Sequence, residues 1–254
     1  MKKIFLYILV GSLSFAACKS DSDESTYVEP EDIAVQNTYD DQAIQKFLND
    51  NYLDAQGNIK AFSSSDASDD NETKLADLSP VTLPSGVVYI KREGAQPAAN
   101  TGKTLATGEY KDVIKLMLKM SYNLAGSTDG NVSFITSGDL VNTINGTSSS
   151  GSPVTDPMYY YVKNSFLEAA TTDVAKQRSY YEIEGFQEGL SYFQSFIDKP
   201  NGDPYNLQGV IIVPSRAAFA RDSHYNYNGV SFRNMTFIFN FQLYDAKTRT
   251  DDQK

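Results

Sequence analysis

The stretch that decides the fold reads Asn234-Met235-Thr236-Phe237-Ile238-Phe239-Asn240-Phe241-Gln242-Leu243. Side chains alternate between the two faces of a β-strand, so every second residue points the same way. On that spacing the three phenylalanines at 237, 239 and 241 and the leucine at 243 share one face. We therefore predict a strand over residues 236–244 with a fully apolar side.

Two further blocks precede this strand in the last third of the chain. They are Glu182-Ile183-Glu184-Gly185-Phe186-Gln187-Glu188-Gly189-Leu190 and Val213-Pro214-Ser215-Arg216-Ala217-Ala218-Phe219. The apolar residues Phe186, Leu190, Phe193 and Ile197 recur at helical spacing, which predicts a helix over residues 186–197. An apolar run over residues 207–213 predicts another strand.

In this order the three blocks resemble the C-terminal half of FKBP-type peptidyl-prolyl isomerases. The family pattern is roughly V-I-x-G-W-x-E-G-L, then I-P-x-x-x-A-Y-G, then N-x-T-L-x-F-x-V-E-L. Residues 86–91, followed by Gly94, resemble the family's opening strand. The resemblance covers residues 83–246 and implies an α+β, FKBP-like fold: a twisted antiparallel β-sheet half-wrapped around a short α-helix, with a pocket between them.

The remaining pattern predicts the other elements. Alternation from Asp112 to Tyr122 indicates a strand with Ile114, Leu116, Leu118 and Met120 on its apolar side. Asp129-Gly130 is a hairpin signal, so residues 132–136 are expected to pair back. Residues 137–180 exceed the family's segment and form an insertion, with a short strand at 158–162 and a helix at 165–178. The insertion either shapes substrate choice or only elaborates the surface.

An N-terminal helical extension is predicted before the FKBP-like domain. Tyr39, Ala43, Ile44, Phe47 and Leu48 fall on one helical face, so we expect a helix over residues 39–52, capped by Thr38 or Asp40. The helix either covers apolar surface or binds a partner. A polar linker follows at 63–73, which places the helix and linker within residues 38–82.

Residues 1–17 form an expected export signal. Lys2 and Lys3 precede an apolar run that is too short to span a membrane. Ala-Ala-Cys resembles a bacterial lipoprotein signal with Cys18 as the lipidated residue; the alternative is a simple secretory signal. Residues 18–37 are predicted to be a tether, whose acidic start resembles the surface-export signal of Bacteroidota lipoproteins or is only a solvated linker. We expect a lipid anchor in the outer membrane of the cell envelope, periplasmic or surface-exposed.

Composition excludes several classes of function. The formal net charge is −10 and no basic stripe appears, so we expect no nucleic-acid partner. One histidine and one cysteine exclude a conventional zinc site. The acidic residues of 63–73 lack the spacing of a calcium loop. We therefore expect no metal and no cofactor.

The resemblance implies a pocket for proline-containing polypeptides. Its catalytic positions fall on Phe134, Ile183, Phe186, Phe219 and Phe239, and its substrate-binding positions on Met120, Tyr122 and His224. In this assignment the backbone N–H of Ile183 binds the ligand carbonyl and the phenylalanines form the floor and walls. Phe219 lacks the hydroxyl of the family's tyrosine, and Ile135 stands where the family has an aspartate.

Prolyl isomerisation needs an apolar cup more than it needs reactive groups. The X–Pro bond rotates over a barrier of about 18–20 kcal/mol set by amide resonance, and a dry pocket favours the less polar twisted state. The sequence therefore predicts an isomerase that assists folding of envelope or surface proteins. The alternatives are a catalytically degenerate relative that binds extended peptides and a structural component of a surface assembly.

Overall fold

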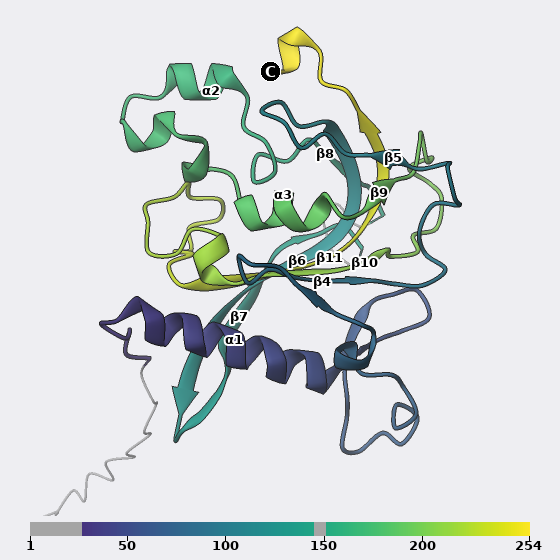
Figure 1. Cartoon of the computed structure of the whole chain (residues 1–254), viewed down its shortest axis with the longest axis vertical. Helices are drawn as coiled ribbons and strands as arrows, with labels where there is room; N and C mark the ends of the chain where they lie inside the picture. Colours follow the sequence, from purple (N-terminus) through teal and green to yellow (C-terminus); the bar gives the residue numbers. More distant parts are fainter. Residues whose placement is uncertain (1–26, 145–150) are drawn as a thin grey trace, which may run out of the picture.

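The computed structural model describes residues 27–144 and 151–254. It is an α+β domain around one antiparallel sheet of seven strands, in the order β3-β4-β10-β11-β6-β7, with β8 paired to the start of β6 (Figure 1). The strands are β3 (Val81–Thr82), β4 (Val88–Lys91), β6 (Val113–Thr128), β7 (Asn131–Asn142), β8 (Val154–Thr155), β10 (Gly209–Val213) and β11 (Met235–Lys247). Two small sheets join β1 (Asn51–Leu53) to β2 (Ile59–Ala61) and β5 (Lys103–Thr104) to β9 (Gln194–Ser195).

β11 lies between β10 and β6, and its alternation is as predicted. Its fully buried phenylalanines and Leu243 face the core that contains α3 (Glu184–Leu190). Ile238, on the other face, joins a second apolar cluster with α1 (Ile33–Asp50). The strand is buried from Met235 to Ala246 because both faces of the sheet are covered.

β6 and β7 form a long hairpin. The turn residues Asp129 and Gly130 both have positive φ, 51° and 80°, as a two-residue turn between twisted strands requires. The strand predicted over 112–122 extends to Thr128, because residues up to Thr128 pair with β7. The register shifts twice along the pairing, between Met120/Ser121 and between Leu124/Ala125.

α3 crosses one face of the sheet close to β10. A Cβ added at Gly185 or Gly189 would come within 2.5 Å of Val213 or 2.7 Å of Ile211, so the glycines permit this approach. The predicted helix over 186–197 is wrong at its C-terminal half: α3 ends at Leu190, and the chain turns into β9. Ile197 is 61% exposed as a result.

α1 covers the opposite face and begins earlier than predicted. Asp32 caps it by accepting a hydrogen bond from the Ala34 amide at 2.8 Å, so residues 33–37 of the expected tether are helical. Ile33 and Val35 are exposed, which hides the helical period there. Ile44 and Leu48 pack against β4 and β10. The helix therefore covers apolar sheet surface, the first of its two predicted roles.

The predicted insertion at 137–180 differs from expectation. β7 occupies its first residues, and the predicted strand at 158–162 is a turn in which the amides of Tyr160 and Tyr161 donate to the carbonyl of Pro157. The predicted helix at 165–178 is broken. Short helical segments replace it: α2 (Asn164–Ala169), η2 (Val174–Lys176) and η3 (Arg178–Tyr180). The other short turns are η1 (Leu75–Asp77), η4 (Ser215–Ala217) and η5 (Asp251–Gln253).

The described residues bear only in part on the predictions about the membrane and the N-terminus. Within 27–144 and 151–254, no helix is long and apolar enough to span a bilayer. The predicted signal peptide, Cys18 and the first part of the predicted tether lie outside the described residues.

Candidate functional site

The predicted site residues meet between α3 and the sheet. The rings of Phe186 and Phe239 stack with centroids 3.9 Å apart and planes 12° apart. Met120 pairs with Phe239 across the neighbouring strand. Ile183 is the residue that precedes α3, and Phe219 lies 6.0 Å from Phe237 between ring centroids. Most of the predicted site residues therefore lie together in the structure.

This aromatic set is packed core. Ile183, Phe186 and Phe239 are 0% exposed and Phe219 is 2% exposed. A cup able to accept a prolyl ring from solvent would leave part of such surfaces accessible. Within the described residues the structure has a filled cup.

Tyr159 fills the cup. Its ring centroid lies 6.1 Å from that of Phe186, 6.2 Å from that of Phe239 and 6.3 Å from that of Tyr227. The Ile183 amide donates to the Tyr159 carbonyl oxygen at 2.8 Å. The N–H that the resemblance assigns to the substrate carbonyl thus bonds a carbonyl of the same chain.

The Tyr159 hydroxyl is buried and has no hydrogen-bond partner among the described residues. Burial raises its pKa above the ordinary value, because the apolar surroundings disfavour the phenolate. An unpaired buried hydroxyl costs about 1–3 kcal/mol. Packing of the Tyr159 ring therefore stabilises the fold, whereas burial of its unpaired hydroxyl destabilises it.

The segment around Tyr159 is anchored at several points. The Val162 amide donates to the Glu182 carboxylate at 2.9 Å, and the Gln187 side chain donates to the Tyr160 carbonyl at 2.6 Å. Two guanidinium groups lie over the Tyr161 ring, those of Arg178 at 4.6 Å and Arg249 at 3.8 Å. These contacts make the turn at 156–162 an integral part of the fold.

Arg249 ties this turn to the end of the sheet. Its side chain is 1% exposed, and its two terminal nitrogens reach the two carboxylate oxygens of Asp156, at 2.7 and 2.5 Å. Its Nε donates to the Lys111 carbonyl at 3.0 Å. A bidentate pair of this kind fixes the relative orientation of the two side chains as well as the distance between them.

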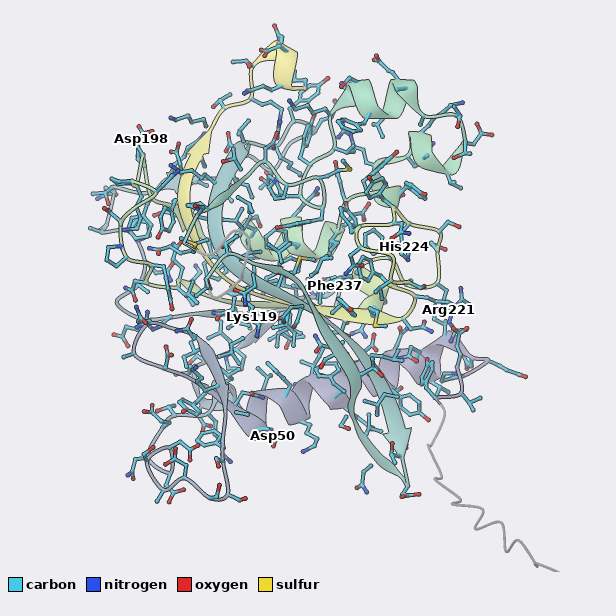
Figure 2. The ribbon with its side chains drawn as sticks, turned by 180° about the vertical axis from the view of Figure 1, so that it is seen from behind. Asp50, Lys119, Asp198, Arg221, His224 and Phe237 are labelled. Atoms are coloured by element: carbon cyan, nitrogen blue, oxygen red, sulfur yellow. The ribbon has the colours of Figure 1, made fainter. Side chains whose placement is uncertain are left out.

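His224 has a structural position beside Phe219. Its Nε2 accepts a hydrogen bond from the Phe232 amide at 2.9 Å, and its Nδ1 lies 3.0 Å from the Tyr225 carbonyl. A neutral ring with the proton on Nδ1 satisfies both contacts. Figure 2 shows His224 on the loop before β11 and Phe237 on the sheet. The histidine orders this loop, and Phe232 closes the space next to Tyr122, 5.4 Å away between ring centroids.

Phe134 is not with the other site residues. It belongs to the cluster on the opposite face, where its ring meets Phe47 edge-on at 6.0 Å. Between the pairs Leu124–Thr136 and Ala125–Phe134 the register shifts, and Ile135 turns toward the α3 side. A change of one residue in register reverses the faces of a strand. This shift is the physical reason that the predicted wall residue is misplaced.

Three residues that fill the site escaped sequence reasoning: Tyr159, Tyr227 and Phe232. The consecutive tyrosines at 159–161 could have indicated a buried segment, because three adjacent large rings are costly to expose. Within the described ranges, no group of three or more His, Cys, Asp or Glu side chains is arranged to hold a metal.

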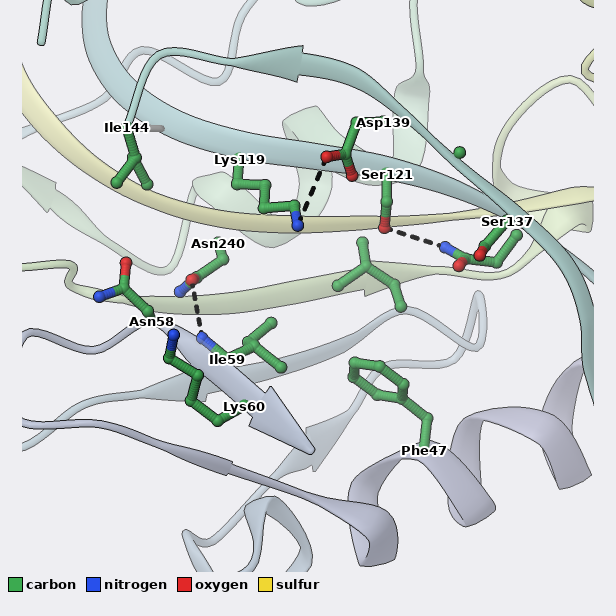
Figure 3. A pocket seen from close by; sticks show the side chains of 13 residues that line it. Phe47, Asn58, Ile59, Lys60, Lys119, Ser121, Ser137, Asp139, Ile144 and Asn240 are labelled. Atoms are coloured by element: carbon green, nitrogen blue, oxygen red, sulfur yellow. Dashed lines mark hydrogen bonds and ion pairs between the residues drawn. The ribbon is translucent and has the colours of Figure 1, made fainter. Parts of the chain in front are cut away.

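An open cavity of about 280 Å³ lies on the other side of the sheet. Residues of α1, β2, β6, β7 and β11 line it, including Phe47, Lys60, Lys119, Ser137 and Asp139 (Figure 3). Its lining combines polar side chains such as Ser137 with apolar ones such as Phe47, unlike the aromatic cup around Tyr159.

No family model matches this chain, and no curated protein matches it. One similar solved structure is FkpA from Escherichia coli, at 18% identity and a TM-score of 0.34. The match covers 66% of this chain and 52% of FkpA, so the chain spans about half of that protein's length. So distant a likeness assigns neither activity nor substrate.

Proposed function

We propose that this chain is an FKBP-like domain that binds extended polypeptide segments without isomerising them. The observation that carries the proposal is the hydrogen bond from the Ile183 amide to the Tyr159 carbonyl. Both the donor expected for the substrate and the space above Phe186 are used by the chain itself. This supports the catalytically degenerate alternative over the predicted active isomerase.

Displacing Tyr159 would be costly. Removing a buried aromatic ring from a packed core costs about 3–5 kcal/mol. A protein whose binding-competent state is disfavoured by that amount loses roughly a hundredfold or more in apparent affinity at that site. The anchored turn at 156–162 adds to the cost.

A free sheet edge supports the polypeptide-binding part of the proposal. β7 pairs with β6 on one side, and none of the described residues forms a strand on its other side. Over Asn131–Gly138 this edge carries no charged residue. Extended peptides bind such edges by adding a strand, with main-chain hydrogen bonds providing affinity.

A protease-coupled assay on short X–Pro peptides tests the absence of catalysis. We expect the wild-type chain to leave the isomerisation rate at its uncatalysed value, with an active FKBP-type isomerase as the positive control. In parallel, a reduced and carboxymethylated protein serves as an extended polypeptide, and we expect it to bind the wild-type chain. An accelerated rate, or no binding to the extended chain, contradicts the proposal.

The predicted isomerase is the second candidate, and the unpaired Tyr159 hydroxyl favours it. A side chain with an unsatisfied buried group is easier to displace than one that is fully paired. If the cup opens in this way, wild-type activity is present and Phe186→Ala and Phe239→Ala abolish it. The same assay therefore decides between the two candidates.

The proposed location is the cell envelope, with Cys18 as the lipidated residue. This part of the proposal depends on residues 1–18 alone, which carry a signal-like sequence. Metabolic labelling with a fatty acid is expected to mark the wild-type chain and to fail with Cys18→Ser. Equal labelling of both proteins contradicts it.

A further inference from the structure

We propose that the cavity on the α1 face binds an acidic side chain of an extended polypeptide that lies along β7. This inference rests on the proposed polypeptide-binding function and names what the site selects. The cavity lies between β2 and the β6–β7 hairpin, with Lys60 on one side and Lys119 on the other (Figure 3).

Two asparagine side chains that line the cavity bind the segments around it. Asn240 donates to the carbonyls of Gly57 and Gly209 and accepts from the Ile59 amide, so both of its amide protons are used. The Asn58 side chain donates to Asp54 at 2.9 Å. These contacts fix β2 against β11 and give the cavity a constant shape.

The ammonium groups are available to a ligand. Lys60 is exposed, and its ammonium group has no hydrogen-bond or ion-pair partner among the described residues. Lys119 lies 3.4 Å from an Asp139 oxygen, and both side chains are 48% exposed, which makes this a weak pair. Two cations thus face one carboxylate, in a chain whose net charge is −10. The cavity is a locally positive site that favours an anion.

The rest of the lining suits a carboxylate on an apolar stem. Phe47, Ile59 and Ile238 form an apolar part, and Ser137 carries a hydroxyl with no partner among the described residues. The Ser121 hydroxyl accepts from Asn123 and keeps its own proton free to donate. A glutamate side chain presents such a methylene stem and anionic head. At about 280 Å³ the cavity has room for a glutamate side chain.

The position of the cavity indicates a polypeptide as the source of that carboxylate. Ser137, Gly138 and Asp139 line the cavity and belong to β7, the edge strand. A strand added to β7 would run past the opening, and every second side chain would lie on the face of the sheet that holds the cavity. Backbone pairing would then supply affinity and the two lysines the selectivity.

Three blocked pentapeptides test this inference: acetyl-Thr-Val-X-Val-Thr-amide with X as Glu, Gln or Lys, each with the same fluorophore. By fluorescence anisotropy we expect the Glu peptide to bind about tenfold more tightly than the Gln peptide, and the Lys peptide to bind most weakly. Added salt should reduce the difference. Lys60→Ala with Lys119→Ala should remove the preference, and Asp139→Asn should increase it.

Lys176→Ala is the control for each single lysine change, because it removes one positive charge from an exposed position on η2, outside the cavity lining. Equal binding of the three peptides, or an unchanged preference in the double lysine variant, overturns the inference and leaves polypeptide binding intact. No binding of any peptide overturns it as well. Isomerase activity with a retained preference for Glu contradicts only the non-catalytic function.

Discussion

The Ile183 amide and the Tyr159 carbonyl are joined by a 2.8 Å hydrogen bond, and this bond closes the space between α3 and the sheet. It also places the Tyr159 ring against Phe186 and Phe239. The space between the aromatic rings is therefore occupied by a side chain of the same chain.

Tyr159→Phe should stabilise the protein. The substitution keeps the ring that fills the cup and removes a buried hydroxyl that has no partner among the described residues. We expect the free energy of unfolding in urea to rise by about 1 kcal/mol. Tyr244→Phe is the control, because the Tyr244 hydroxyl donates to the Asp203 carbonyl at 3.0 Å and its loss should cost about 1 kcal/mol. Losses of equal size in both variants would show that the Tyr159 hydroxyl is paired.

Phe186→Ala and Phe239→Ala should each lower the free energy of unfolding by about 3–5 kcal/mol, because both rings are fully buried. Their stacking at 3.9 Å predicts a coupling of about 0.5–1.5 kcal/mol in a double-mutant cycle. Phe134→Ala, at a half-buried position on the opposite face, should cost only about 1 kcal/mol. A cost for Phe134→Ala as large as for the other two would place it in the same core.

The elements that sequence predicts well are those with strict periodicity. β11 from Phe237 to Leu243 and the apolar side of β6 from Ile114 to Met120 follow a period of two, and the start of α3 follows from its helical spacing. Phe134 was misplaced because a register shift is not encoded in alternation. The predicted helix began later than α1 does, because Ile33 and Val35 are exposed and hide the helical period there. Hydrophobic periodicity reflects which side chains are buried, so it does not predict the start of a helix or strand that begins in solvent.

The filled cup could not be predicted from the residues that form its walls. The three blocks specify Ile183, Phe186 and Phe239, but the occupant comes from a turn within the insertion. Its position depends on long-range partners, such as Glu182 for the Val162 amide and Arg249 for Tyr161. Contacts of this kind arise only once the sheet is assembled.

Arg249→Met should loosen the turn that holds Tyr159. The change keeps much of the apolar stem but leaves the Asp156 carboxylate, 14% exposed, without its partner. We expect a loss of about 3 kcal/mol in the free energy of unfolding. Hydrogen exchange should accelerate more in residues 156–164 than in β11. Lys46→Met removes an exposed pair with Asp50 and should cost less than about 1 kcal/mol. Uniform acceleration across both segments would argue against a local role for Arg249.

Asp40 should make the docking of α1 sensitive to pH. Its buried carboxylate accepts hydrogen bonds from the Ser215 amide at 2.9 Å, the Ser215 hydroxyl at 2.5 Å and the Gln36 side chain at 3.0 Å. Burial is the largest effect and raises the pKa of Asp40 above its ordinary value of 3.8, even though these bonds lower it.

The sign of the dependence follows from that shift. Because the folded state holds the proton more tightly, the stabilisation from Asp40 is complete below pH 3.8 and is lost as the pH rises through the folded-state pKa. Asp40→Asn removes this titration but also disturbs the bonds to Ser215, so it should lower stability by about 1–3 kcal/mol. Its deficit should be largest at the acid end and shrink as the pH rises.

Urea unfolding at intervals from about pH 4 to pH 8 measures this difference. Asp41→Asn is the control, since Asp41 is 57% exposed and its pair with Arg216 should contribute little at any pH. A deficit for Asp40→Asn that grows with rising pH would mean that the folded state lowers the pKa of Asp40. The bonds from Ser215 and Gln36 would then outweigh burial, and α1 would be held most firmly at neutral pH.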